Sequence, residues 1–415
     1  MTFLPTKEHF RREFRKTPPG RLARRVLLAR AERHRRSLTE TRFVAVTGSS
    51  AKTTTKELIA AVLSTQLRGT KTPDTTNAAA SAARTILGTR PSDDFCVVEA
   101  AAWEPGSITA TTQLVRPDIA VVTTIGREHF KALRTPEDSA AEKRTLVEGA
   151  GRMAVLNADD PLVLAMGEGF RGEVVTFGES PDATVRAADV HGTWPERLSL
   201  TVTHGGRTLP VSTRFCGTYW TTSVLAALAV GLALDVPLEA GIAAVEAFEP
   251  LPGRMSPVVC DGITFVRDDR KAPIWSLPLA LGFVADAEAE RKVVVLGTIS
   301  DYPGAAGKVY RRVARQALEV ADEVVFVGPQ SARVEKAQKR APEAPLRVCP
   351  TVRDATEYLS ATLRSGDLVL LKGSIADHLA RIILARTETI RCWRQRCGRA
   401  ISCEVCWLRG VPGGP

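Results

Sequence analysis

The chain has 415 residues, of which 44% are hydrophobic and 25% charged, a composition typical of a soluble globular protein with two or three domains. It has no run of about 18 apolar residues, and charge occupies the positions near the N-terminus where a signal peptide would be apolar. We therefore expect a cytoplasmic protein without a transmembrane helix, in which much of the formal net charge of +10 lies before residue 42.

The basic segment 1–41 is predicted to be partly helical. Residues 21–36 have helical spacing, with Leu22, Val26 and Leu27 near one face. One interpretation is weak contact with an anionic membrane surface, with nucleic acid or with a partner. We favour a solvated helix that packs on the main body through this short apolar stripe, because a charged helix face usually faces water. No nucleic-acid partner is expected.

An α/β pattern begins at residue 42. Short apolar runs at 42–47, 95–99, 119–124 and 152–157 predict buried strands, and a helix is expected from about residue 53 to 67. Strands that alternate with helices favour a mainly parallel sheet covered on both faces. Residues 180–215 are polar and punctuated by glycine, which favours antiparallel strands. A helix from about residue 222 to 234 closes this part.

A second α/β pattern follows a break at residues 249–254, where two prolines and a glycine interrupt the periodicity. Its predicted strands are 263–266, 292–296, 323–327 and 367–371, with helices between them, which indicates a smaller Rossmann-like domain. We therefore divide the chain into a basic helical extension, a larger α/β domain, a smaller α/β domain and a cysteine-rich tail, at residues 1–41, 42–250, 251–385 and 386–415.

The motif Thr47-Gly-Ser-Ser-Ala-Lys-Thr-Thr-Thr-Lys56 lies between a predicted strand and a helix, where a phosphate loop belongs. Lys52 would neutralise the β- and γ-phosphates, and the Thr53 hydroxyl would bind Mg²⁺. The spacing departs from the usual loop, since Val46 and Ala51 stand where glycines are expected. A Ser/Thr-rich helix cap is the alternative. The predicted nucleotide-binding loop is Gly48, Ser49, Ser50, Ala51, Lys52, Thr53 and Thr54.

Three further residues are candidates for the same site. Glu99 ends a predicted strand, where a carboxylate could hold a metal ion at the sheet edge, although a solvated strand end is the alternative. His129 follows the next strand, and alone it would be read as structural. Lys143 alone would be a solvated helix lysine.

Together and in order, these residues resemble the Mur ligases, most closely the branch that adds D-alanyl-D-alanine. The resemblance spans about residues 42 to 385. The matching motifs are Gly48-Ser-Ser-Ala-Lys-Thr-Thr-Thr-Lys-Glu57, Glu99, Arg116-Pro-Asp-Ile-Ala-Val-Val-Thr-Thr-Ile125, His129, Ala140-Ala-Glu-Lys143, Asn157-Ala-Asp-Asp160, Gly253-Arg254 and Leu371-Lys-Gly-Ser374.

The resemblance implies a central ATP-binding domain at 42–250, a Rossmann-like C-terminal domain at 251–385, and an ATP-dependent ligase that joins a carboxylate to an amine through an acyl phosphate. It implies Thr53 and Glu99 on one Mg²⁺, and His129 with a carbamylated Lys143 on the other. Lys52, Arg254 and Lys372 would act on the phosphates or substrate, the latter two after domain closure. The family's nucleotide-binding positions also map to Ser223, Arg254, Asp268 and Asp269.

Several departures narrow the expectation. Ala51 places a Cβ where φ may need to be positive, at a cost of about 1 kcal/mol. The family's histidine and asparagine before the closing helix are Tyr219 and Ser223 here, and the D-D-S-Y-N-A-N-P segment is rewritten over residues 268–275. We therefore expect an amine other than D-alanyl-D-alanine. Only a short basic segment precedes the loop, so a UDP-anchored substrate is not expected to be held in the usual way.

The tail contains four cysteines whose spacing, with one C-x-x-C pair, could form a structural Zn²⁺ site. They are Cys392, Cys397, Cys403 and Cys406. A cysteine-bearing tail without metal is the alternative.

Three other functions remain open beside the ligase. The first is a catalytically altered Mur-like protein that binds nucleotide as a partner or regulator. The second is a peptidoglycan-precursor ligase acting on a UDP-linked muramoyl peptide. The third is a scaffold that uses its basic N-terminus and a zinc tail. The combined presence of the phosphate, metal and lysine positions favours an active enzyme.

Overall fold

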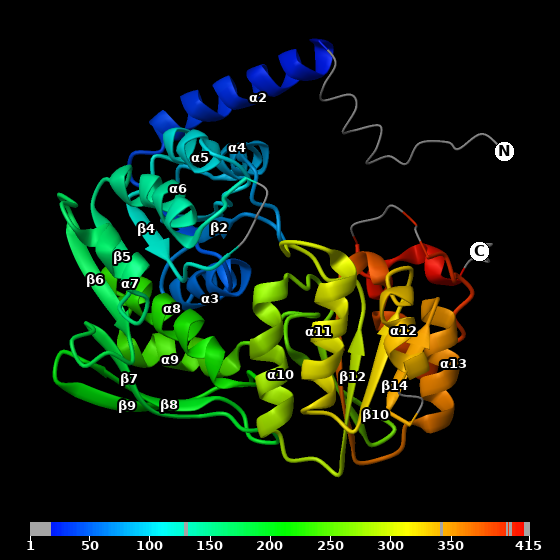
Figure 1. The fold of residues 1–415 in the computed structure, drawn as a ribbon. Coiled ribbons are helices and arrows are strands. Elements are labelled where there is room, and N and C mark those ends of the chain that lie inside the picture. Colours follow the sequence, from blue (N-terminus) through cyan, green and yellow to red (C-terminus); the bar gives the residue numbers. More distant parts are fainter. Residues whose placement is uncertain (1–17, 128–131, 341–342, 396, 398–400, 411–415) are drawn as a thin grey trace.

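The computed structural model describes residues 18–127, 132–340, 343–395, 397 and 401–410. Two α/β units lie side by side, each built on its own sheet, and α2 (Pro18–Ser37) lies on the outer side of the first unit (Figure 1). Within this described part, none of the helices combines the length and apolar character needed to cross a bilayer.

The first unit contains a nine-stranded sheet in the order β2-β3-β1-β4-β5-β6-β7-β8-β9. Strands β1 to β7 pair in parallel, whereas β7 to β9 form an antiparallel meander, as the polar, glycine-punctuated sequence predicts. The strands are β1 (Arg42–Thr47), β2 (Gly69–Lys71), β3 (Phe95–Glu99), β4 (Ile119–Val122), β5 (Met153–Asn157), β6 (Glu173–Gly178), β7 (Val185–His191), β8 (Ser199–His204) and β9 (Arg207–Ser212).

Helices cover both faces of this sheet, because alternate residues of each buried strand point to opposite sides. Val44 and Val46 pack towards α3, α8 and α9, whereas Phe43 and Ala45 pack towards α2, α4, α5 and α6. The helices are α3 (Lys52–Leu63), α4 (Ala79–Gly88), α5 (Ser107–Val115), α6 (Pro136–Glu148), α7 (Pro161–Leu164), α8 (Thr221–Ala233) and α9 (Leu238–Ala247).

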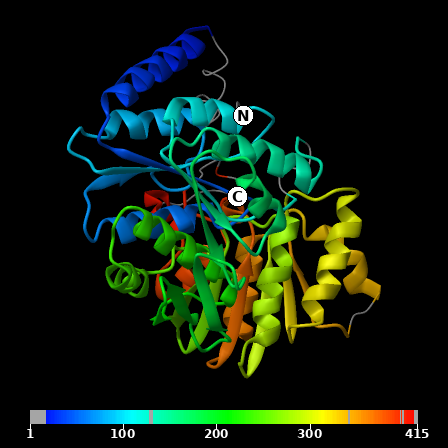
Figure 2. The same ribbon diagram turned by 90° about the vertical axis from the view of Figure 1, so that its left-hand side faces the viewer.

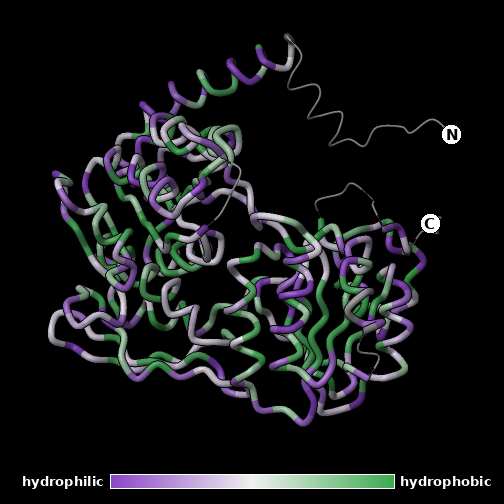
Figure 3. The backbone as a smooth tube through the Cα atoms, viewed as in Figure 1, coloured by the Kyte–Doolittle hydropathy of each residue, from purple (hydrophilic) through white to green (hydrophobic). Residues whose placement is uncertain are grey.

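The second unit has a six-stranded sheet in the order β10-β11-β15-β12-β13-β14, parallel except for the edge hairpin of β10 and β11. Its strands appear as hydrophobic runs between helices (Figure 3). The elements are β10 (Ser256–Cys260), β11 (Ile263–Asp268), α10 (Leu277–Asp286), β12 (Arg291–Leu296), α11 (Ala306–Leu318), β13 (Glu323–Val327), α12 (Ala332–Arg340), β14 (Leu346–Cys349), α13 (Val352–Thr362), β15 (Asp367–Lys372) and α14 (Ala380–Thr387).

The predicted α/β architecture with a mainly parallel sheet and a smaller second sheet is confirmed. One apolar core runs from the first unit into the second, since residues of α3 and α8 share a cluster with residues of α10 and α11. The shared core fixes the two units against one another. Loops from both units therefore meet in one place. Figure 2 views the molecule from the side of the first unit.

The prediction for the N-terminal helix was partly wrong. Leu22 and Val26 were expected to pack on the body, but they are 63% and 49% exposed. The packing contact is made by Leu27, as predicted, together with Leu28 and Ala31, on the face of the helix opposite Leu22 and Val26. The physical reason is that α2 turns the face of Leu27, Leu28 and Ala31 towards α4 and α5.

Candidate active site

The phosphate loop is held rigidly against the end of β4. Gly48 has a φ of +144°, and a Cβ there would lie 1.9 Å from Oγ1 of Thr123, so no side chain fits. The Ser49 N–H donates to the carbonyl of Thr124 at 2.7 Å, and Oγ of Ser50 lies 3.0 Å from Oγ1 of Thr124. These contacts fix the loop before any ligand arrives.

The loop opens directly into α3. Ala51 precedes the helix in the left-handed region, at φ +62° and ψ −6°, so the strain expected from the sequence is present. No side chain caps α3, which leaves the N–H groups of its first turn available to anionic oxygens. The Lys52 ammonium donates to the carbonyl of Gly48 and so lies over the loop.

A carboxylate from the neighbouring strand reaches the first turn of α3. Glu99 ends β3 and is 2% exposed. Its two oxygens accept hydrogen bonds from the Thr53 hydroxyl at 2.8 Å and from the Asn77 amide at 2.9 Å. A hydroxyl beside a buried carboxylate is a set of hard oxygen donors, the kind that Mg²⁺ prefers. The residues present therefore fit a magnesium ion.

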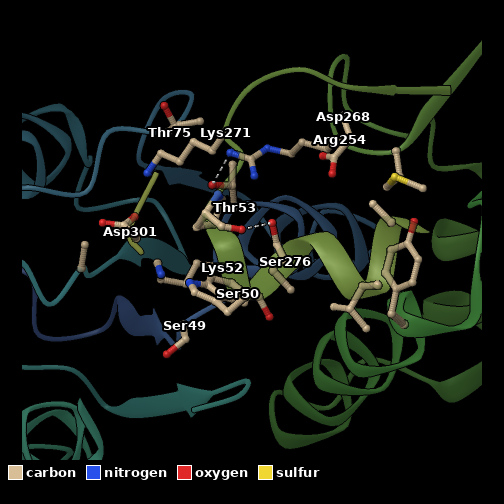
Figure 4. A pocket seen from close by; sticks show the side chains of 18 of the residues that line it. Ser49, Ser50, Lys52, Thr53, Thr75, Arg254, Asp268, Lys271, Ser276 and Asp301 are labelled. Carbon is tan, nitrogen blue, oxygen red and sulfur yellow. Dashed lines mark hydrogen bonds between the residues drawn. The ribbon is translucent and has the colours of Figure 1, made fainter. Parts of the chain in front are cut away.

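Arg254 brings the second unit into the same site. One of its terminal nitrogens donates to Oγ1 of Thr53 at 3.0 Å (Figure 4). Burial lowers the pKa of Arg254, and the carboxylates of Glu99 and Asp268 partly oppose this. The guanidinium remains a cation and places positive charge next to the loop.

Lys372 and Asp268 form an ion pair at the end of the second sheet. They are opposite one another in the register of β11 and β15, and the Lys372 ammonium donates to Oδ2 of Asp268 and, at 3.2 Å, to the carbonyl of Lys271. Lys372 is only 3% exposed. The pair holds a cation at the carboxyl edge of the second sheet, facing the phosphate loop across the pocket.

The rewritten segment after Asp268 forms another wall of the pocket. An isolated bridge joins Pro273 to Ser300, so Lys271, Trp275 and Asp301 lie on one side of the pocket. The Lys271 ammonium lies 6.0 Å from the ring centre of Trp103, which belongs to the first unit. This wall presents an ammonium, a carboxylate and two indoles to a ligand.

Nine of the predicted site residues line one pocket between the two units, and Figure 4 shows several of them converging. They are Ser49, Ser50, Ala51, Lys52, Thr53, Glu99, Arg254, Asp268 and Lys372. His129 lies outside the described residues.

Other predicted residues do not reach the pocket wall. Ser223 is fully buried, and its hydroxyl accepts from Thr55 at 2.9 Å, so the position assigned to nucleotide contact instead joins α3 to α8. Asp269 points away and pairs with Arg267. Gly48 and Thr54 lie behind the loop surface. Lys143 is fully buried on α6, and its ammonium donates to Ser139 at 2.8 Å.

Sequence reasoning missed several pocket residues. Asn77 follows β2, at the same sheet edge that identified Glu99, but a three-residue strand gives too short a pattern to detect. Trp220 is buried and Tyr219 partly buried against the pocket, and the Tyr219 hydroxyl has no hydrogen-bond partner in the described structure. Burial raises the pKa of Tyr219 well above its usual value, and the Asp268 charge adds to this. Asp301 gave no signal in the sequence.

The predicted zinc site is not supported by the described residues. Within residues 18–127, 132–340 and the described parts beyond, no group of three or more His, Cys, Asp or Glu side chains is arranged to hold a metal. The sulfurs of Cys397 and Cys403 instead lie 3.5 and 3.4 Å from opposite ring nitrogens of His378. Arg381 donates to the sulfurs of Cys403 and Cys392. A ring and a guanidinium thus occupy the space between sulfurs that a Cys₄ site would bring together.

The chain matches two sequence families, described as Mur ligase middle domain over residues 46–231 and as Mur ligase, glutamate ligase domain over residues 253–375. The UDP-N-acetylmuramoyl-tripeptide–D-alanyl-D-alanine ligase of Mycobacterium tuberculosis is 30% identical over 365 residues, which cover 82% of this chain and 72% of that protein. No residue of the site is assigned by these matches alone.

Solved structures share the fold. MurF from Acinetobacter baumannii superposes with a TM-score of 0.79 at 22% identity, covering 88% of this chain and 81% of that one. The MurF ligase from Thermotoga maritima in complex with ADP gives a TM-score of 0.75 at 21% identity, covering 85% and 82%.

Proposed function

The chain belongs to the Mur ligase family, and from this premise we propose that it joins a carboxylate to an amine through an acyl phosphate, releasing ADP and phosphate. It is an ATP-dependent ligase that forms a carbon–nitrogen bond. The observation that carries the proposal is the position of Thr53, whose hydroxyl contacts Glu99 of the first unit and Arg254 of the second. The phosphate loop, the Glu99 carboxylate and the Arg254 guanidinium therefore meet at the Thr53 hydroxyl.

ATP binds with its phosphates on the loop. The N–H groups of the first turn of α3 and the Lys52 ammonium stabilise the phosphate oxygens, because both place positive charge where negative charge lies. A substrate carboxylate must approach this triphosphate as an anion. Lys52 and Arg254 lower the repulsion between the two anions, so that the carboxylate oxygen can attack the γ-phosphorus.

Ligands for two magnesium ions are proposed. Thr53 and Glu99 would hold the first, and His129 with a carbamylated Lys143 would hold the second. Bound magnesium would neutralise charge on the transferring phosphoryl group. Carbamylation would give the fully buried Lys143 an anionic oxygen in place of an ammonium, and so a hard donor of the kind that Mg²⁺ prefers.

The second unit completes the reaction. Lys372 is buried and Arg254 partly buried at the junction, and both hold cations near the transferred phosphoryl group. Their burial excludes water, which would otherwise hydrolyse the acyl phosphate. The amine then attacks the acyl carbon and displaces phosphate.

The amine is proposed to enter along the rewritten wall. The relatives are named for adding D-alanyl-D-alanine to a UDP-N-acetylmuramoyl-tripeptide. Here Lys271, Trp275 and Asp301 line the pocket, and the segment from residue 268 to 275 departs from the family pattern. We infer that the amine differs from D-alanyl-D-alanine and that the enzyme works in the cytoplasm, where ATP is supplied.

Phosphate release from ATP across a panel of carboxylates and amines tests the proposal, with hydroxylamine as a surrogate amine. We expect carboxylate-dependent phosphate and hydroxamate, both reduced roughly 10²-fold or more by Lys52→Ala, since Lys52 stabilises developing charge. Lys308→Ala, an exposed lysine on α11, is the matched control. No hydroxamate with any carboxylate, and wild type equal to Lys52→Ala, would favour a nucleotide-binding regulator instead.

A further inference from the structure

The positive charge of the chain is concentrated at one end. Residues 1–41 contain 12 Lys and Arg against 4 Asp and Glu, a net +8, whereas residues 42–415 contain 44 against 42, a net +2. Most of the protein is therefore nearly neutral. A cationic segment of this kind attracts polyanions or anionic surfaces.

The second half of α2 is fixed to the body. Leu27, Leu28 and Ala31 pack on the apolar core at α4 and α5. The Arg35 guanidinium donates to the carbonyl of Val115 at 2.7 Å and lies 3.9 Å from the ring centre of Phe43. Buried contacts of this kind hold the orientation of the whole helix.

The opposite face of α2 is unpartnered and apolar. Leu22, Val26 and Ala29 follow helical spacing, so they lie along one face. Leu22 is 63% and Val26 49% exposed, and Ala29 is also exposed. In both ribbon views the first turns of α2 project beyond the helices beneath them (Figures 1 and 2).

Arginines surround this apolar face. Within the part of the chain that the structure describes, three arginines beside this face are exposed and have no acidic partner: Arg25, Arg30 and Arg33. The alternation of apolar and basic residues is visible along α2 in Figure 3. The preceding 17 residues add Lys7, Arg11, Arg12, Arg15 and Lys16 to the sequence, together with Phe3, Phe10 and Phe14.

We propose that α2 docks on an anionic lipid surface, with Leu22 and Val26 inserted among the headgroups and the surrounding arginines paired with lipid phosphates. Basic residues near such a surface and apolar side chains at the acyl boundary contribute together to binding by amphipathic helices. Nucleic acid would engage the arginines but would gain nothing from exposed leucine and valine. The proposal is independent of the ligase reaction, since α2 lies on the outer side of the first unit, and none of its residues lines the pocket.

Co-sedimentation of the full chain with vesicles tests the proposal. We expect binding to vesicles of equal parts phosphatidylglycerol and phosphatidylcholine, weak binding to pure phosphatidylcholine, and loss of affinity as salt is raised. Arg25→Gln with Arg30→Gln should lower the partition coefficient roughly 30-fold at low salt, at about fivefold per charge. Leu22→Ser with Val26→Ser should lower it roughly tenfold.

Matched controls lie on other surfaces. Arg311→Gln with Arg312→Gln removes two exposed arginines from α11, and Leu164→Ser with Val259→Ser removes two exposed apolar side chains. Both pairs should bind like wild type. Circular dichroism and ATP-dependent activity in solution should be unchanged in the α2 variants.

Two results would overturn the proposal. If Leu22→Ser with Val26→Ser binds vesicles like wild type, the two apolar side chains do not insert into the lipid and the binding is purely electrostatic. If the chain binds single-stranded RNA with an affinity that falls steeply as salt is raised, while it does not bind the anionic vesicles, the surface belongs to nucleic acid.

Discussion

Arg254 of the second unit donates a hydrogen bond of 3.0 Å to the hydroxyl of Thr53 in the first. The same hydroxyl donates to Glu99 at 2.8 Å. One threonine therefore links the phosphate loop, a buried carboxylate and the second unit. Because the link crosses between units, nucleotide binding and the arrangement of the two units are expected to depend on each other.

Replacing Arg254 should impair chemistry more than nucleotide binding. Arg254→Ala removes a cation from the transferred phosphoryl group, so kcat should fall roughly 10²- to 10³-fold, while the KM for ATP changes little. Steady-state phosphate release measures both constants. Arg254→Lys should recover only part of the rate, because an ammonium lacks the planar donor fork.

The control is Arg214→Ala, an exposed arginine paired with Glu249. It should leave both constants within about twofold, as expected for a surface ion pair. A loss of ATP affinity in Arg254→Ala with an unchanged kcat would instead assign the guanidinium to nucleotide binding.

Lys271 is predicted to select the amine. Lys271→Ala removes the cation of the rewritten wall, so the KM for an anionic or zwitterionic amine should rise roughly tenfold, the value of a charge-assisted hydrogen bond. The KM for ATP should stay constant. The measurement compares an amino acid with its amide, which lacks the carboxylate.

For the amide, wild type and Lys271→Ala should have nearly equal KM values. Lys308→Ala provides the control of equal charge change. A rise in the KM for ATP, with both amines unaffected, would place Lys271 at the nucleotide and contradict the proposed amine wall.

The sequence predicted the parts of the fold that short-range patterns encode. The phosphate loop, Glu99 and the strands around them follow from apolar runs that end in polar residues, and these were placed within a few residues. Ser223 was assigned to the nucleotide from a motif position, which says nothing about which way a helix face turns. The structure turns this face of α8 towards α3.

The pocket wall of the second unit could not be predicted for another reason. Asp301 lies next to the rewritten segment only because Pro273 bridges Ser300, a contact between residues far apart in the chain. Similarly, the tail cysteines suggested a metal, but the packing of His378 and Arg381 among the sulfurs is visible only in three dimensions.

Acid should destabilise the second unit through His378. Burial, aided by Arg381, lowers the pKa of His378 from 6.5 to about 4. The unfolded chain therefore binds the proton more tightly than the folded one between these values. The stabilisation is complete above about pH 6.5 and is lost as the pH falls through about 4, by up to about 3 kcal/mol.

Urea unfolding near pH 7.5 and near pH 4.5 measures this loss. The side chain of His378→Gln cannot be protonated, so the free energy of unfolding of this variant should depend less on pH across that window. His204→Gln, at a histidine on the first unit whose side chain is partly exposed, should keep the wild-type slope. Equal slopes for wild type and His378→Gln would show that other groups cause the acid sensitivity.

Ala51 carries the left-handed conformation of the phosphate loop, at φ +62°. Ala51→Gly should relieve about 1 kcal/mol of strain, partly offset by the greater freedom of glycine in the unfolded chain, for a net gain of about 0.5 kcal/mol. Ala305, at φ −77°, also directly precedes a helix. Ala305→Gly therefore makes the same substitution before a helix at a residue that has no left-handed strain to relieve. The difference between the two unfolding free energies, measured by urea titration, isolates the backbone effect. If Ala51→Gly is no more stable than Ala305→Gly, the loop does not strain Ala51, and the departure from the family's glycine has no cost.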